Sequence, residues 1–203
     1  MWSGNRPATG ARSSEMMVEA PWIASGLTIR PARRDEVPAL ESLIAVSARI
    51  LSRGFYSEEE TEAAISHVFG VDTDLVDDGT YLLVEQDGQL LGCGGWSRQR
   101  TLFGGDRFAA RTPGFLDPAS DAARIRAFFV APEAARRGVG AALLAACEDR
   151  ARNAGFTRTA LMATLPGVPF YARHDYVAGE PISQRCGDIS VCFVPMSKEL
   201  LRI

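Results

Sequence analysis

The sequence predicts one domain of mixed α/β (α+β) fold, and three features of the chain favour it. Residues 125–130 form a short run rich in aromatic and β-branched side chains, which is typical of a buried strand. Residues 139–151 repeat apolar side chains at helical spacing. Residues 81–85 and 89–97 read as two strands around an Asp-Gly pair, which is a strong hairpin signal. With 203 residues in all, the chain has the length of a single domain.

Composition and charge argue against several classes of function. Hydrophobic residues make up 46% of the chain and charged residues 23%, as in ordinary soluble globular proteins. The net charge of −3 argues against bulk nucleic-acid binding, and no stretch approaches the length of a membrane span. The four cysteines show no CxxC pairing and the two histidines stand alone, so we expect reduced thiols and no metal site.

The first residues of the chain show no pattern typical of a helix or a strand. Residues 1–26 mix Gly, Ser, Pro and Arg without periodicity and lack the apolar core of a secretory signal. We interpret them as a flexible extension of a cytoplasmic protein, with the folded domain at 27–203. That domain begins with a short strand at 27–31. Asp35 is then expected to cap a helix whose apolar residues follow helical spacing over 37–50.

A second helix is predicted to begin at Ser57, because Glu60 completes a capping box with it. We interpret the acidic run that follows Ser57 as capping rather than as a polyamine-binding patch. Further along, the second arm of the hairpin contains three closely spaced glycines, Gly92, Gly94 and Gly95. They indicate a bulge or the close approach of a backbone or ligand. Trp96 lies beside them and is a candidate substrate contact.

Segment 98–122 contains several Gly and Pro residues and shows no clean periodicity. Loops this long in compact domains are usually functional or disordered. Phe103, Phe108 and Phe115 argue against disorder, because disordered segments are poor in aromatic residues. Two interpretations remain open: a flap over the substrate site, or a surface insertion.

Residues 123–155 are predicted to form a strand, a basic loop and a helix. The strand should stop before Pro132, which cannot continue a ladder, and Gly155 is a good left-handed C-cap. Glycines at 138 and 140 would let an anion approach the unpaired N–H groups of the first helical turn. Arginines at 136 and 137 could pair with phosphate oxygens. The loop indicates a pyrophosphate site; a helix start with two solvated arginines is the alternative.

Two familiar nucleotide motifs fit this loop poorly. A Walker loop needs GxxxxGK[ST], and Lys198 is the single lysine of the chain. A dinucleotide loop needs GxGxxG, but Leu143 stands at the third glycine position. The next predicted strand, 159–164, also ends without the acidic residue that binds a ribose.

The loop instead resembles motif A of the GNAT superfamily of acetyl-CoA-dependent N-acetyltransferases, in which Q/R-x-x-G-x-G/A binds the pyrophosphate of CoA. Gly138 and Gly140 match the motif glycines, and Ala135 stands where the family has Gln or Arg. Residues 170–176, Phe-Tyr-Ala-Arg-His-Asp-Tyr, resemble the family's LYxxxGF ending, with Asp175 in the place of Gly. The resemblance covers about residues 27–203.

The resemblance implies a mixed, mostly antiparallel sheet that is splayed between the fourth and fifth strands, with helices on both faces. It implies acetyl-CoA as co-substrate and no metal. The residues expected to bind acetyl-CoA are Phe128, Phe129, Val130, Arg136, Arg137, Gly138, Val139, Gly140 and Ala141. Tyr171 matches the family's general acid, which protonates the departing thiolate. No general base is visible, because the strand before the loop carries arginines where many relatives have a carboxylate.

The expected function is transfer of an acetyl group from acetyl-CoA to a primary amine of a small molecule or peptide by direct attack. Strand alternation would place Arg124, Arg126 and Phe128 on one face, where Arg126 could hold a substrate carboxylate. A surface or salt-bridged arginine is the alternative. A non-catalytic acyl-CoA-binding regulator is the second interpretation of the whole chain, and an NAD enzyme is a distant third. A homodimer is left open.

Overall fold

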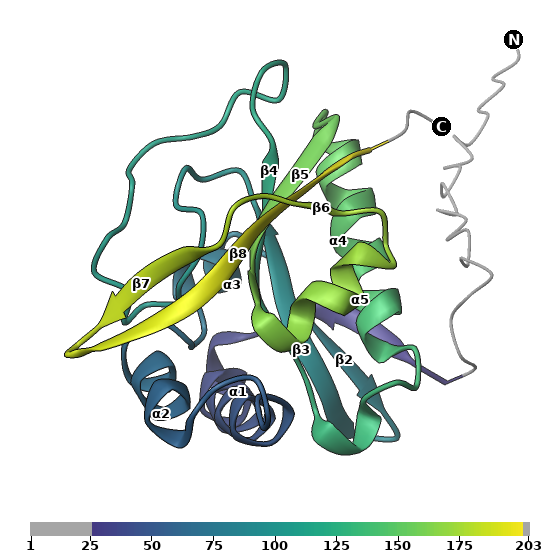
Figure 1. Ribbon diagram of the computed structural model, residues 1–203. Coiled ribbons are helices and arrows are strands. Elements are labelled where there is room, and N and C mark those ends of the chain that lie inside the picture. Colours follow the sequence, from purple (N-terminus) through teal and green to yellow (C-terminus); the bar gives the residue numbers. More distant parts are fainter. Residues whose placement is uncertain (1–25, 201–203) are drawn as a thin grey trace, which may run out of the picture.

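A single mixed sheet lies at the centre of the protein, with helices on both faces (Figure 1). The computed structural model describes residues 26–200, so the extension expected at 1–26 falls almost wholly outside the described residues. The strands are β1 (Thr28–Pro31), β2 (Tyr81–Gln86), β3 (Gln89–Ser97), β4 (Ala123–Val130), β5 (Arg158–Thr164), β6 (Val177–Ala178), β7 (Ile182–Cys186) and β8 (Ile189–Glu199). The α-helices are α1 (Val37–Leu51), α2 (Glu58–His67), α3 (Thr73–Asp77), α4 (Val139–Asn153) and α5 (Val168–Ala172).

The sheet opens between its two central strands. Its order is β1-β2-β3-β4-β5-β8-β6, and β7 also pairs with β8. All pairs are antiparallel except β4 with β5, which are parallel. These two strands pair only from Ala123 to Ile125 against Thr159 to Leu161, and then they part. The expected splay between the fourth and fifth strands is confirmed.

Each face of the sheet carries its own hydrophobic cluster. The helical spacing of α4 turns Val139, Leu143 and Cys147 toward one face, and we call this the α4 cluster. On the opposite face, α1 contributes Leu40 and Ile44, and we call this the α1 cluster. The two clusters are separated by the sheet, so any cavity that passes between β4 and β5 connects them.

Several local predictions are confirmed. Ser57 accepts from the N–H of Glu60, whose carboxylate accepts from the N–H of Ser57, as the capping box requires. The hairpin turns through Asp87 and Gly88, both with positive φ (51° and 78°), which suits the twist of the two strands. Gly155 follows α4 in the left-handed region with φ 92°.

Other local predictions need correction. Asp35 does not cap a helix, because it lies in a short 3-10 turn (Arg34–Glu36) and α1 begins after it with Pro38 in its first turn. The two strands β6 and β7 have no counterpart in the predicted elements. Both are short strands added along β8, and their own sequence carries too few alternating residues to reveal them.

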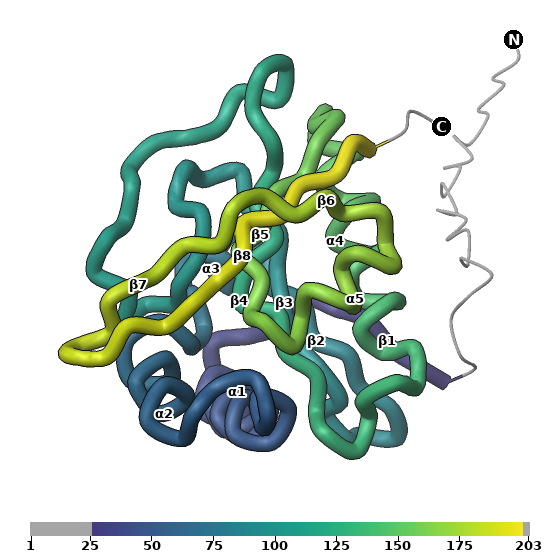
Figure 2. Tube along the Cα trace, viewed as in Figure 1, coloured from purple at the N-terminus to yellow at the C-terminus, as the bar shows by residue number. Residues whose placement is uncertain are grey.

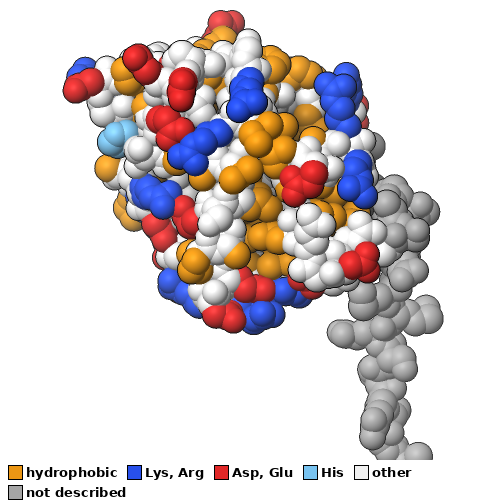
Figure 3. Space-filling view, turned by 90° about the horizontal axis from the view of Figure 1, so that it is seen from below, with side chains coloured by type: hydrophobic (Ala, Val, Ile, Leu, Met, Phe, Trp, Pro, Cys, Tyr) orange, Lys and Arg blue, Asp and Glu red, His pale blue; other side chains and the backbone are white. Residues whose placement is uncertain are grey.

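The surface carries both signs of charge. On the face shown in Figure 3, acidic and basic side chains are interspersed around a central group of hydrophobic ones. In the part of the chain that the structure describes, no helix combines the length and apolar character needed to cross a membrane.

Candidate active site

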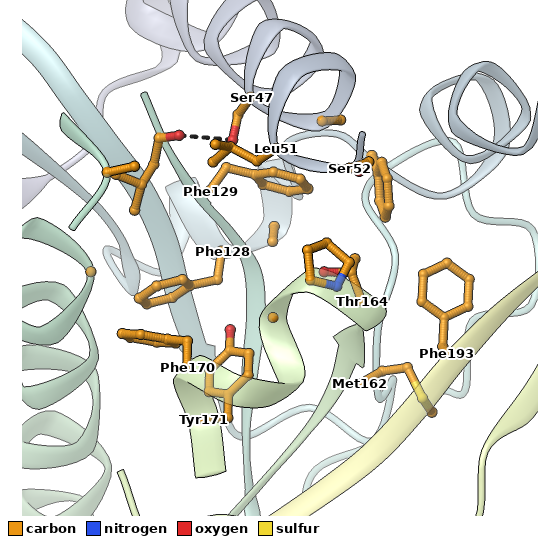
Figure 4. Close-up of a pocket in the computed structure, with 18 of the residues that line it drawn as sticks. Ser47, Leu51, Ser52, Phe128, Phe129, Met162, Thr164, Phe170, Tyr171 and Phe193 are labelled. Atoms are coloured by element: carbon orange, nitrogen blue, oxygen red, sulfur yellow. Dashed lines mark hydrogen bonds between the residues drawn. The ribbon is translucent and has the colours of Figure 1, made fainter. Parts of the chain in front are cut away.

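A cavity of about 710 Å³ lies where β4 and β5 part (Figure 4). Its walls come from α1, β4, the loop before α4, β5, α5, β8 and segment 98–122. Phe128 and Tyr171 on its wall pack with the α4 cluster, whereas Phe129 and Phe193 pack with the α1 cluster. The cavity therefore passes through the sheet and connects its two faces.

Two groups of aromatic side chains line the two ends of this passage. The first, called the α5 aromatic group, consists of Phe128, Phe170, Tyr171 and His174, with neighbouring ring centroids 4.7–6.1 Å apart. The second, called the β8 aromatic group, consists of Phe69, Phe103, Phe129 and Phe193, with neighbouring centroids 5.3–6.1 Å apart. Figure 4 shows Phe128 and Phe170 on one side of the cavity and Phe193 on the other, with Tyr171 between them.

The loop before α4 presents a row of free backbone donors. Arg136 and Gly138 both have positive φ, 63° and 86°, so the chain turns sharply before the helix begins at Val139. Among residues 26–200, none of the N–H groups from Gly138 to Ala141 donates a hydrogen bond; the first that does is the N–H of Ala142. These free donors and the helix dipole create a site for an anion.

The two glycines of the loop have different physical roles. A Cβ on Gly138 would meet open space, but its left-handed backbone disfavours any other residue. A Cβ on Gly140 would lie 3.3 Å from the ring of Phe170 and 3.6 Å from Val130, so this glycine lets α4 approach the cavity wall closely.

The structure brings most of the sequence-predicted site residues to the cavity. Those that line it are Phe128, Phe129, Val130, Arg136, Gly138, Gly140, Ala141 and Tyr171. Arg137 is exposed and Val139 is buried in the α4 cluster, so neither side chain is on the wall. The carbonyl of Val130 already accepts a hydrogen bond of 2.8 Å from the Ser47 hydroxyl.

Tyr171 is the member of the α5 aromatic group that lies on the Phe193 side of Phe128 and Phe170 in Figure 4. Its ring is buried, and Figure 4 shows its hydroxyl directed into the cavity. Within the described residues this hydroxyl has no hydrogen-bond partner. Burial raises the pKa of Tyr171 well above the usual value for a phenol, so the group is protonated at neutral pH.

A bulge in β4 changes which side chains share a face. Gly95 pairs with Arg126 and Cys93 pairs with Phe129, so Ala127 and Phe128 both face Gly94. Ala127 is the extra residue of this bulge, and its backbone has a φ of 49°. The expectation that Arg126 and Phe128 share a face is wrong, because the bulge interrupts the alternation on which it depended.

Arg126 and Trp96 are not on the cavity wall. The Arg126 side chain is fully buried; its Nη2 lies 2.6 Å from the Asp72 carboxylate and donates to the carbonyl of Gly104. Trp96 packs edge-on against Phe156 in the α4 cluster, at 6.3 Å between ring centroids. These positions argue against the expected role of either residue in substrate binding.

Segment 98–122 forms the long loop on the left of Figure 2, and its residues 103–105 contribute to the cavity end lined by the β8 aromatic group. Asp72 holds it through Arg111, whose Nη2 lies 2.7 Å from the carboxylate, and the N–H of Gly105 donates to the carbonyl of Val68. Phe103, Gly104 and Gly105 line the cavity as a result. The structure favours the flap over the surface insertion for this part of the segment.

The basic side chains of the described cavity wall are confined to the α4 loop and the end of α5. They are Arg136, Arg173 and His174. Within residues 26–200, no group of three or more His, Cys, Asp and Glu side chains is placed to hold a metal ion.

Sequence reasoning missed Phe69 and Phe193 of the β8 aromatic group. Phe69 follows α2, Phe193 lies within β8, and the nearby wall residue Met162 belongs to β5. In the sequence, each of these residues looks like an ordinary core residue of the segment that contains it, and no motif relates one to another. Of the other two members, Phe129 was expected from the family resemblance, and Phe103 was marked as an aromatic residue in a long loop.

Comparisons with known proteins agree with this geometry. A family model described as "Acetyltransferase (GNAT) family" matches residues 46–176, more than half of the chain. A search of curated proteins found no match. Among solved structures, a GCN5-related N-acetyltransferase from Rhodopseudomonas palustris superposes with a TM-score of 0.65 at 21% identity, covering 87% of this chain and 97% of that one.

Two other solved structures share the fold. The PaiA N-acetyltransferase from Thermoplasma acidophilum, in complex with coenzyme A, has a TM-score of 0.57 and 16% identity, with 85% of this chain and 98% of that one covered. A ribosomal-protein-alanine N-acetyltransferase from Brucella melitensis has a TM-score of 0.54 and 18% identity, with 85% and 99% covered. At these identities the likeness shows the arrangement of the strands and helices.

Proposed function

Because the chain belongs to the acetyltransferase (GNAT) family, we propose that it transfers the acetyl group of acetyl-CoA to a primary amine of a small molecule or peptide. The observation that carries the proposal is the row of free N–H groups from Gly138 to Ala141, which opens onto the passage between β4 and β5. An anion held at this row lies at one end of the cavity. The acceptor amine would then enter from the other end.

The start of α4 would hold the pyrophosphate of acetyl-CoA. Four backbone N–H groups at this helix start have no partner among the described residues, and the left-handed turn at Gly138 leads directly into them. The Arg136 side chain lies on the cavity wall and can pair with phosphate oxygens. Open space at Gly138 supports the approach of a bulky anion.

The free edge of β4 and the hydroxyl of Tyr171 support a site for the part of acetyl-CoA that carries the acetyl group. From Arg126 onward β4 has no strand partner on its β5 side, so its edge at Phe128 to Val130 can meet the amides of an extended chain, although the Val130 carbonyl already accepts one hydrogen bond from Ser47. When bound, acetyl-CoA supplies an activated acetyl group as a thioester. The hydroxyl of Tyr171 would hold the proton that a departing thiolate needs, and burial keeps that proton in place at neutral pH.

The proton on the attacking amine has no evident acceptor on the described cavity wall. Ser47 and Thr164 are neutral, and His174 stacks against Phe170 beside the α4 loop, at 4.7 Å between ring centroids. We infer that the amine enters in its neutral form or loses its proton through water. The rate should then rise with pH until the amine itself is largely neutral.

Gly138→Val tests the cofactor site. The valine must adopt the left-handed backbone, and its branches would occupy the space above the free N–H groups, so we expect acetyl-CoA affinity to fall about 10- to 100-fold. This magnitude corresponds to the loss of one hydrogen bond to a charged group, about 1.5–3 kcal/mol. Isothermal titration calorimetry on the folded variant measures it.

Gly155→Val is the matched control for this experiment. Gly155 lies at the other end of α4 with a similar φ of 92°, and its Cβ would contact only Pro118 at 3.6 Å. Both variants should lose stability by about 1–2 kcal/mol from the left-handed backbone, but only the change at Gly138 should weaken acetyl-CoA binding. Equal affinity in the two variants would remove the pyrophosphate assignment. Tight acetyl-CoA binding without turnover of any amine would favour the regulator instead.

A further inference from the structure

We propose that the acceptor is a primary amine carried on an aromatic or similarly apolar body, without a carboxylate or a second cationic group. This inference rests on the proposed acetyltransferase function and concerns the end of the cavity away from the α4 loop. The wall of that end is formed by Leu51, Phe69, Phe103, Phe129, Met162 and Phe193. Figure 4 shows Met162 and Phe193 facing the cavity from the side opposite Phe128 and Phe170.

The aromatic rings at this end support one another before any ligand arrives. Phe69 meets Phe129 and Phe193 edge-on, at 5.3 Å and 6.1 Å between ring centroids. Phe103 is held against Phe193 at 5.8 Å and against Phe108 of its own segment at 4.7 Å. An aromatic body entering here would bury apolar surface and gain further edge-to-face contacts.

The charges nearest this end are already paired with one another. Asp72 is fully buried between Arg126 and Arg111, at 2.6 Å and 2.7 Å. Glu41 accepts from the N–H of Val71 and pairs with Arg107 at 2.7 Å. A carboxylate or second ammonium on the acceptor would be buried beside Phe69 and Phe103, and the described wall residues of this end carry no charge to pair with it, which is unfavourable.

The charged groups of the wall lie where they suit the cofactor instead. Arg136 belongs to the α4 loop, and Arg173 and His174 follow α5. An acceptor that extends from the amine toward the β8 aromatic group moves away from all three. The passage thus has a cationic end and an apolar end, and the amine would lie between them, near Tyr171.

Three primary amines test the proposal. Phenethylamine has the proposed chemistry, phenylalanine adds a carboxylate to it, and putrescine replaces the ring by a second ammonium. We expect kcat/KM with phenethylamine to exceed that with either of the others by about 100-fold, because each charged group would be buried unpaired. Along a series of n-alkylamines, kcat/KM should rise about fourfold per methylene as apolar area is buried.

Phe103→Ala and Phe115→Ala provide the matched pair of variants. Both change a phenylalanine of segment 98–122, but Phe103 lines the cavity whereas Phe115 is 64% exposed and does not. Phe103→Ala should lower kcat/KM for phenethylamine about tenfold or more and leave acetyl-CoA affinity unchanged. Phe115→Ala should behave like the unchanged protein in both measurements.

The outcomes separate this inference from the function on which it rests. Failure to bind acetyl-CoA by calorimetry would overturn the proposed function. Normal acetyl-CoA binding together with equal or faster turnover of phenylalanine or putrescine would overturn the inference alone. Acetyl-CoA binding without acetylation of phenethylamine would overturn it as well, because phenethylamine has every feature that the apolar end requires.

Discussion

Tyr171→Phe is expected to lower kcat by about 10²- to 10⁴-fold, the usual contribution of a positioned general acid, and to leave acetyl-CoA affinity nearly unchanged. Phenylalanine keeps the ring and its packing against Phe128 and Phe170, so the cavity retains its shape. What it removes is the hydroxyl that points into the passage. Steady-state kinetics with a competent amine, together with calorimetry for acetyl-CoA, measures both quantities.

The pH dependence follows from the raised pKa of Tyr171. A phenol donates its proton only below its pKa, so the rate should fall as pH rises through that value. Burial raises the pKa above the ordinary value of about 10, so no alkaline fall from Tyr171 is expected between about pH 7 and 10. Tyr171→Phe should therefore lower the pH–rate profile by the same factor over this interval.

Tyr176→Phe is the control for the loss of a buried tyrosine hydroxyl. Its ring lies 5.6 Å from that of Tyr171, and its hydroxyl bonds to Thr159 at 2.9 Å away from the cavity wall. This variant should lose about 1 kcal/mol of stability with little change in kcat. If Tyr171→Phe and Tyr176→Phe give the same kcat, Tyr171 is a packing residue and the proton comes from elsewhere.

Asp72→Asn is expected to lower the free energy of unfolding by about 3–5 kcal/mol, because it leaves Arg126 as a buried charge without its partner. Asparagine still accepts a hydrogen bond from the N–H of Asp74, so the N-cap of α3 is retained and only the charge is lost. The change also removes the ion pair between Asp72 and Arg111, which holds segment 98–122 against the domain. Urea unfolding at neutral pH measures the change.

Asp77→Asn provides the comparison for this prediction. Asp77 pairs with Arg34 on the surface, where both side chains are more than half exposed. Solvent screens such pairs, so this change should cost less than about 1 kcal/mol. A cost for Asp72→Asn as small as that for Asp77→Asn would contradict the assignment of Asp72 as the counter-charge that Arg126 requires.

The sequence by itself determined the framework of the candidate site. The strand, loop and helix around Gly138 follow from composition, a proline stop and helical spacing, all of which act over a few residues. Tyr171 could be singled out for a similar reason, because the segment 170–176 resembles a known motif. The hairpin at Asp87 and Gly88 could also be predicted from neighbouring residues alone, because its turn requires positive φ at both positions and an Asp-Gly pair adopts it readily.

The tertiary structure alone decided the apolar end of the cavity and the place of Arg126. The β8 aromatic group joins residues from the end of α2, segment 98–122, β4 and β8, and no spacing rule relates them. The bulge at Ala127 arises from pairing with β3, and a shift of one residue moves every later side chain to the other face. Phe128 therefore lies on the opposite face from Arg126, which meets Asp72, its buried counter-charge, although strand alternation alone had placed the two residues together.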